Sequence, residues 1–181
     1  MKPSRTLPLL LILLALPALA LAWRHHIPVF PMSEGLPDPA LTPGALDPAV
    51  TQADIRRTIC VRGWTRTVRP PEWYTERLKR RQIREYGYAD RWLRDYEEDH
   101  LVPLELGGSP SSPRNLWPEP HRVVGGWGSY AKDRLENRLN HLVCREQLRL
   151  ASARRQIAGN WIAAYRRFLG PVPDHRPPRQ R

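Results

Sequence analysis

Apolar residues recur at helical spacing in three stretches of the chain. They predict helices over residues 72–86, 130–143 and 150–169, each with one apolar side. Pro71 suits the start of the first helix, and Gly170-Pro171 stops the last. The side chains expected to be buried are Trp73, Leu78, Ile83 and Tyr86 in the first helix, Ala131, Leu135, Leu139 and Leu142 in the second, and Ile157, Trp161, Ala164 and Phe168 in the third.

Shorter patterns predict strands and turns between these helices. A helix cap over residues 51–54 predicts a short helix to about Ile59, and the alternation over residues 60–68 predicts a short strand. Apolar runs on either side of Gly107-Gly108 and a polar loop at 109–114 predict strand, loop, strand and then the helix from residue 130. The expected fold is therefore α+β and mostly helical, with a small hairpin-plus-helix core packed against additional helices.

The two ends of the chain differ in composition from its middle. Basic residues precede an apolar run over residues 7–22, which ends in a small-x-small site, so residues 1–22 are expected to be a cleaved signal peptide. The mature protein would be periplasmic or secreted without stable membrane insertion; an N-terminal membrane anchor is the alternative. Residues 23–50 predict a Pro-rich linker or loosely packed arm, 51–170 a single domain, and 171–181 a disordered basic tail.

The chain is strongly basic, with a formal net charge of +11. This charge favours a polyanionic partner, nucleic acid or an anionic surface. Arg80, Arg81 and Arg84 lie on the polar side of the helix predicted at 72–86, where they form either a phosphate-binding patch or a solvated helix face.

Cys60 and Cys144 are the two cysteines of the chain. Export makes an oxidising compartment the expected one, and the two thiols are then expected to form a disulfide. Two buried free thiols are the alternative.

Asp99 and His100 offer a carboxylate and an imidazole side by side. An imidazole can activate water near neutral pH, and a carboxylate can hold a divalent metal ion. Their surroundings resemble the core of HNH endonucleases, which have the ββα-metal fold. The resemblance covers about a quarter of the chain, residues 96–143, and is carried by Asp99-His100-Leu101-Val102-Pro103-Leu104, Gly107-Gly108 and Asn115-Leu116.

The resemblance implies a role for each polar residue of this motif. His100 would be the general base, Asp99 a metal ligand, and Asn115 the residue that holds the loop and orients His100 through its amide carbonyl. HNH proteins usually place a His or Asn on the helix as a further metal ligand, and here the chain departs from that pattern. The spacing does not settle the ligand; Asp133 is the first choice, with His121 and Glu136 as alternatives. Oxygen ligands favour Mg²⁺, and Mn²⁺ and Zn²⁺ are the other candidates.

The function implied by the resemblance is an exported, metal-dependent endonuclease of low sequence specificity. Its partner would be nucleic acid, with DNA favoured over RNA and RNA left open. The alternative is a non-catalytic exported protein of HNH-like fold that uses its basic surface to bind nucleic acid or envelope polymers. Metal-dependent cleavage distinguishes the two.

Overall fold

The computed structural model describes residues 28–171 and 173. The fold is α+β and mostly helical, as predicted, with a two-stranded antiparallel sheet. The predicted signal peptide and most of the predicted tail lie outside the described residues. The elements are helices α1 (Trp64–Val68), α2 (Glu72–Glu85), α3 (Ser129–Cys144) and α4 (Leu150–Phe168), and strands β1 (Tyr96–His100) and β2 (Leu116–Pro120).

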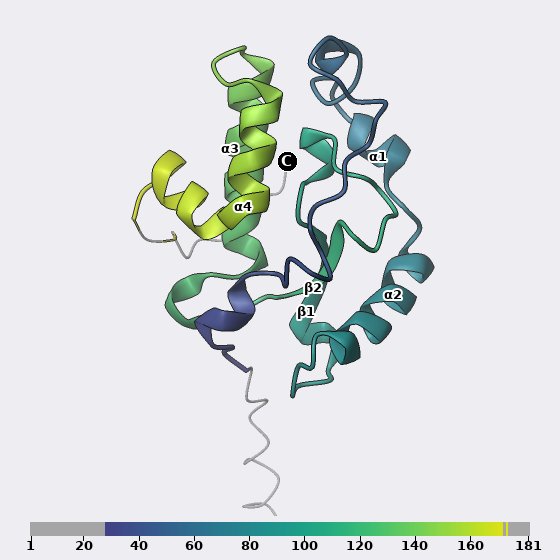
Figure 1. Cartoon of the computed structure of the whole chain (residues 1–181), viewed down its shortest axis with the longest axis vertical. Helices are drawn as coiled ribbons and strands as arrows, with labels where there is room; N and C mark the ends of the chain where they lie inside the picture. The colour runs from purple at the N-terminus through teal and green to yellow at the C-terminus, as the bar shows by residue number, and fades with distance from the viewer. Residues whose placement is uncertain (1–27, 172, 174–181) are drawn as a thin grey trace, which may run out of the picture.

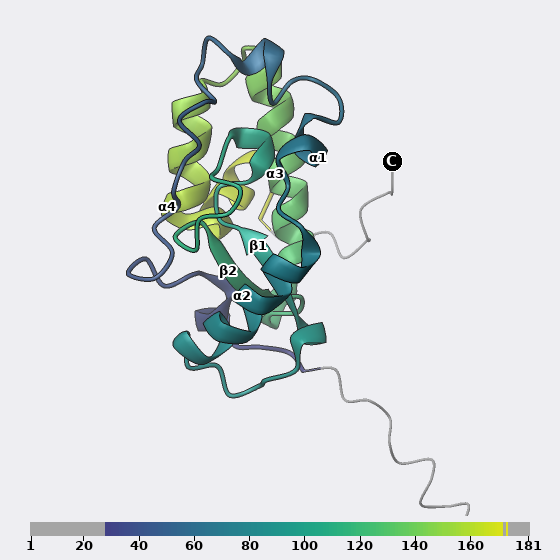
Figure 2. The same ribbon diagram turned by 90° about the vertical axis from the view of Figure 1, so that its right-hand side faces the viewer.

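The β1–β2 hairpin is the centre of the molecule and lies between α2 on one side and the α3–α4 pair on the other (Figure 1). Glu97 pairs with Glu119, and Asp99 pairs with Trp117. Because side chains alternate along a strand, Glu97 and Asp99 share one face of the hairpin. The view at right angles shows α3 behind the hairpin and α2 crossing in front of it (Figure 2).

Burial on α3 and α4 follows the predicted helical spacing. Ala131, Leu135 and Leu139 are buried, and the stripe continues through Val143, whereas Leu142 is half-buried. After Leu139 the buried residue is therefore Val143, at i+4, and not the predicted Leu142, at i+3. On α4 the expected residues Ile157, Trp161 and Ala164 are buried, and Phe168 is partly buried.

The predicted span of α2 is confirmed, but the prediction that Trp73 lies on its buried side is wrong. Leu78 and Ile83 are buried as expected, and Tyr86 is half-buried. Trp73 is 68% exposed. It lies in the first turn of α2.

The strand predicted over residues 60–68 is wrong. This segment is a turn followed by α1, and the short helix expected before it is a 3₁₀ turn over Ile55–Arg57. Gly63 has a φ of 82°, which is left-handed and interrupts any extended run. A strand also needs a partner, and within residues 28–171 the named strands pair only with each other.

Residues 28–50 do not form a loosely packed arm. Phe30 is buried in the core, and its amide donates a hydrogen bond to the carbonyl of Arg122 at 2.8 Å. Thr42 is fully buried and its hydroxyl donates to the carbonyl of Leu116, while Val50 is also buried. Apart from a 3₁₀ turn at Met32–Gly35 the segment has no helix or strand, but the buried side chains of Phe30, Thr42 and Val50 hold it on the domain.

The predicted disulfide between Cys60 and Cys144 is confirmed, with a Cα–Cα distance of 5.6 Å. It joins the segment before α1 to the C-terminal end of α3. Within the described part of the chain, no helix has the length and apolar character needed to cross a membrane.

Candidate active site

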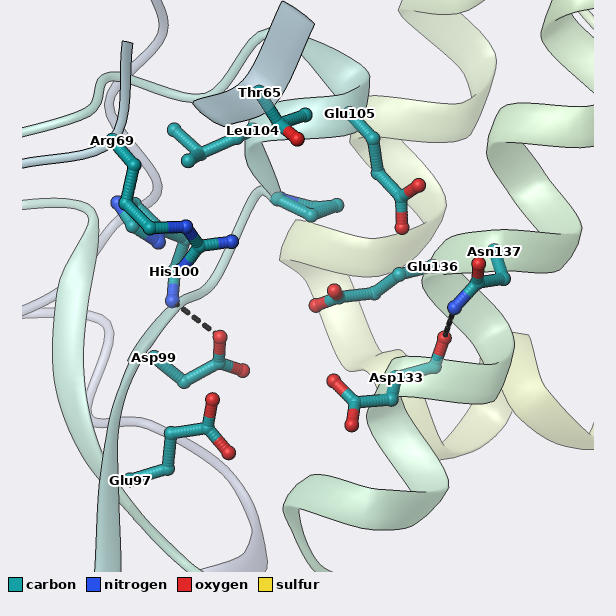
Figure 3. A pocket seen from close by; sticks show the side chains of 11 residues that line it. Thr65, Arg69, Glu97, Asp99, His100, Leu104, Glu105, Asp133, Glu136 and Asn137 are labelled. Atoms are coloured by element: carbon teal, nitrogen blue, oxygen red, sulfur yellow. Dashed lines mark hydrogen bonds between the residues drawn. The ribbon is translucent and has the colours of Figure 1, made fainter. Parts of the chain in front are cut away.

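A cavity of about 320 Å³ opens between β1, α3, the end of α1 and the 3₁₀ turn Leu104–Leu106 (Figure 3). Three of the residues singled out from the sequence line it: His100, Asp99 and Asp133. Glu136, an alternative ligand, lines it as well. The remaining walls are Thr65, Arg69, Glu97, Pro103, Leu104, Glu105 and Asn137.

His100 ends β1, and its ring is held in one orientation. Its Nε2 lies 2.8 Å from the carbonyl oxygen of Pro110. A carbonyl only accepts hydrogen bonds, so in the neutral ring Nε2 carries the proton and Nδ1 keeps its lone pair. Burial lowers the pKa of His100, and the nearby positive charges of Arg69 and Lys132 act in the same direction. The ring is therefore neutral, with a basic Nδ1, at neutral pH.

Asn115 fixes the loop that carries the Pro110 carbonyl. Its Nδ2 donates to the carbonyls of Val102 and Ser109, both at 3.0 Å, and its Oδ1 accepts from the amide of Val102 at 3.0 Å. The expectation that its amide carbonyl orients His100 directly is therefore wrong, because that oxygen binds Val102. Asn115 instead acts on His100 through the neighbouring Ser109–Pro110 peptide.

Two further features hold this loop against the hairpin. From α2, Gln82 donates hydrogen bonds to the carbonyls of Pro113 and Leu116. A Cβ atom on Gly108 would lie 1.7 Å from the carbonyl oxygen of Val102 and 2.7 Å from Nδ2 of Asn115. Only glycine fits under the Asn115 amide, which explains part of the Gly107-Gly108 pair in the motif.

Asp99 is bound on both sides. Its Oδ1 accepts from the amide of His100 at 2.7 Å, and its Oδ2 lies 2.6 Å from Nζ of Lys132. Burial raises the pKa of Asp99, but the Lys132 ammonium outweighs it and lowers the pKa to about 2. Asp99 is therefore ionised at every pH at which the protein is expected to work.

Lys132 is fully buried on α3 and was not singled out from the sequence as a site residue. Its Nζ also donates to the carbonyl of His100 at 2.8 Å and forms an ion pair with Glu136, one helical turn away. Burial opposes its charge, yet Asp99, Glu136 and Glu119 together raise the pKa of Lys132 well above its usual value. It remains a fixed positive charge behind the cavity.

The other carboxyl groups of the cavity hold their protons more tightly than usual. Burial, together with the charge of Asp99, raises the pKa of Glu97 to about 7 and that of Asp133 to about 6. Burial and the charge of Asp133 raise the pKa of Glu105 to about 7. In Figure 3 the carboxylates of β1 and α3 point toward one another across the cavity. Such a group of acids competes for any cation that enters.

Arg69 follows α1 and places its guanidinium at the mouth of the same cavity, next to His100 (Figure 3). Its charge opposes, but does not cancel, the rise in the pKa of Glu105 and Asp133 that burial causes. An arginine in this position can make two hydrogen bonds to a phosphate. It is the one exposed basic side chain in the wall of this cavity.

The donor chemistry of the cavity fits a hard divalent cation. Mg²⁺ and Mn²⁺ prefer carboxylate oxygens, and Mg²⁺ is usually held by one or two carboxylates, water and a substrate phosphate. Asp99 and Asp133 supply such oxygens from opposite walls. Among the described residues no group of three or more His, Cys, Asp or Glu side chains is arranged as a ready-made metal site.

Four residues considered from the sequence lie elsewhere. His121 lines two neighbouring cavities, and its Nδ1 is 2.8 Å from the hydroxyl of Ser129. Arg80, Arg81 and Arg84 are exposed on α2 and line none of these cavities. Sequence spacing did indicate Lys132 and Glu136 as neighbours on one helix face, but nothing in the sequence indicated that Arg69 and Glu105 line the same cavity as His100.

No protein-family model matches the chain, and comparisons with curated proteins and with solved structures find no significant match. Function is therefore inferred from the residues of the cavity.

Proposed function

We propose that this protein is a metal-dependent endonuclease of the HNH type, which hydrolyses phosphodiester bonds of nucleic acid with low sequence specificity. The observation that carries the proposal is the geometry of His100: a neutral imidazole with Nδ1 unprotonated, in one cavity with Asp99, Asp133 and Arg69. These are the base, the cation-binding oxygens and the phosphate-binding charge that the reaction requires.

Each side chain has a distinct task in this proposal. His100 takes a proton from the attacking water at Nδ1, while the Pro110 carbonyl holds Nε2–H. Arg69 binds a non-bridging phosphate oxygen and stabilises the charge that develops on it. Asn115 keeps the Pro110 carbonyl in place through its bond to Ser109.

Asp99 and Asp133 would hold the divalent cation, Mg²⁺ in the first instance. When bound, the cation would supply charge to the scissile phosphate and to the leaving oxygen. Lys132 keeps Asp99 ionised and oriented by holding Oδ2 at 2.6 Å.

A non-catalytic binding protein is the second candidate, and one observation favours it. Both oxygens of Asp99 already have partners inside the protein, Lys132 and the His100 amide. The same basic chain could then bind nucleic acid or anionic envelope polymers without cleaving them.

Incubation of the protein with supercoiled plasmid separates the two candidates. Nicked and linear products are expected with Mg²⁺ or Mn²⁺ and not with chelator, and Zn²⁺ serves as a third arm. His141 provides a matched control, because it is exposed on α3 and lines none of the three cavities. His141→Ala should cleave normally, whereas His100→Ala should not; binding without cleavage in every arm would favour the second candidate.

We also propose that the protein is exported. The disulfide supports an oxidising compartment, and residues 1–22 have the composition of a signal peptide. Fractionation of cells that produce the full chain, followed by N-terminal sequencing of the mature form, tests both parts.

A further inference from the structure

The active-site cavity does not stand alone. A second cavity of about 370 Å³ shares Arg69, Glu97 and His100 with it as wall residues. A third cavity, of about 230 Å³, shares His121 with the second. The second cavity therefore adjoins the first on one side and the third on the other, in a series from Asp133 at one end to Tyr130 and Arg122 at the other.

The far end of this series has an aromatic and largely basic wall, in which Asp95 is the one carboxyl group. The ring of His121 stacks on Tyr130 with 5.4 Å between centroids and 13° between planes. Tyr130 is 50% exposed, so one part of its ring is available to a ligand. Arg94 and Arg122 line the same cavity, and Arg94 also lies over the exposed ring of Trp92, 5.0 Å from its centroid.

We propose that the three cavities form one groove for a single polynucleotide strand, with a base stacked on Tyr130 and the backbone phosphates along Arg69, Arg94 and Arg122. The inference rests on the proposed function, because it extends the same site and names the form of its substrate. His121 supports the stacking ring from behind, held by its contact with Ser129.

The shape of the site favours one strand over a duplex. Proteins that read duplex DNA insert a projecting helix or ribbon into its groove. Here the candidate base His100 is recessed, buried at the bottom of the cavity. Recessed basic grooves with exposed aromatic rings are typical of single-strand binding, in which unstacked bases lie on the rings.

Binding to a non-cleaving protein tests the groove independently of catalysis. Fluorescence anisotropy would compare a labelled single strand with a hairpin duplex of the same sequence, in the His100→Ala background and with chelator. The single strand should bind more tightly. Tyr130→Ala should weaken single-strand binding by roughly 5- to 150-fold, the range of one lost base stack, and should leave duplex binding unchanged.

Two variants control for loss of the ring and for general surface effects. Tyr130→Phe keeps the ring and should bind like the parent. Trp73→Ala removes an exposed aromatic residue that lines none of the three cavities, and should also have no effect. If Tyr130→Ala fails to fold, oligonucleotides with a single abasic position take its place, and one position should show the same loss.

The outcomes separate this inference from the proposed function. Equal or tighter duplex binding, or binding indifferent both to Tyr130 and to abasic positions, overturns the groove even if wild-type protein cleaves plasmid. Tyr130-dependent single-strand binding supports the groove even if no cleavage is found.

Discussion

The Nε2 atom of His100 lies 2.8 Å from the carbonyl oxygen of Pro110, and this contact determines which nitrogen of the ring is basic. The two residues are brought together by a loop that Asn115 holds from one side and Gln82 from the other. The orientation of the proposed base therefore depends on bonds made well away from the cavity.

Replacing His100 with Ala should reduce plasmid cleavage by at least about 10²- to 10⁴-fold, the usual contribution of a positioned base. Binding should change little, because Arg69 and the carboxylates remain. The rates would be measured at saturating Mg²⁺, with His141→Ala beside it. Cleavage by His100→Ala within a few-fold of wild type would show that another group is the base.

Asn115→Ala should lower both stability and activity. It leaves buried backbone groups of Val102 and Ser109 without partners, at about 1–3 kcal/mol for each unsatisfied group. Thermal unfolding measures the first effect, and cleavage well below the melting temperature measures the second. A variant with normal stability and reduced cleavage, or the reverse, would contradict the role assigned to this amide.

Glu98 should make stability depend on pH. Both of its carboxylate oxygens are buried without a hydrogen-bond partner in the described structure, and burial raises its pKa to about 9 despite the charges of Lys79 and Arg81. The folded state thus keeps a proton that the unfolded state loses near the ordinary value of 4.5. Stability should therefore fall as pH rises from about 4.5 to 9.

Glu98→Gln tests this, because glutamine resembles the neutral acid. In melting experiments with chelator, the variant should match wild type near pH 4 and exceed it near pH 8.5. Glu85→Gln changes an exposed residue of α2, and its stability should not separate from that of wild type as pH rises. Parallel curves for Glu98→Gln and wild type would mean that Glu98 is ionised in the folded state.

Removing the disulfide by Cys60→Ser with Cys144→Ser should destabilise the protein by about 4 kcal/mol in the chain-entropy model. The bond spans 84 residues of sequence, which is why the effect is large. Urea unfolding of the double variant and of wild type, with and without reductant, measures it. Wild type plus reductant should unfold like the variant.

Arg69 and the α2 arginines should affect different quantities. Arg69→Gln should lower the rate of cleavage, since its guanidinium lies at the cavity. Arg80, Arg81 and Arg84 changed together to Gln should flatten the dependence of binding on salt and spare the rate. A loss of rate in the triple variant would place these arginines closer to the phosphate than their exposure on α2 indicates.

The sequence predicted helices α2 to α4 well because each has a long apolar stripe. It also predicted a strand, loop, strand and helix around Gly107-Gly108, but the first apolar run (101–106) forms a bend and a 3₁₀ turn, and β1 is the polar stretch Tyr96–His100 before it. It failed where tertiary contacts decide. The alternation at 60–68 resembled a strand, but a left-handed Gly63 and the absence of a pairing partner made it a turn and α1. The prediction of a loosely packed arm failed for the same reason, because Phe30 packs in the core although it lies in no helix or named strand.

The residues of the candidate site also fall into a group that the sequence predicted and a group that it did not. Asp99 and His100 were assigned to the site through the resemblance of their motif to HNH endonucleases, and Asp133 and Glu136 were candidates on the predicted helix; all four line the cavity. Arg69 and Glu105 could not be assigned to it, because only the fold brings α1 and the Leu104–Leu106 turn to β1. The bond from Asn115 to Val102 was also not predictable, since it depends on the path of a 14-residue loop (101–114).

Lys132 gives the acidic wall of the cavity a counter-charge that is part of the chain itself. Because Lys132 pairs with Asp99 and Glu136 without an ion, chelation should leave a native apoprotein that recovers its activity on addition of metal. Under the proposed function, the divalent ion would then act as a trigger and not as a scaffold. The protein would then remain folded but inactive in a metal-poor medium, and would cleave nucleic acid only where the ion is supplied.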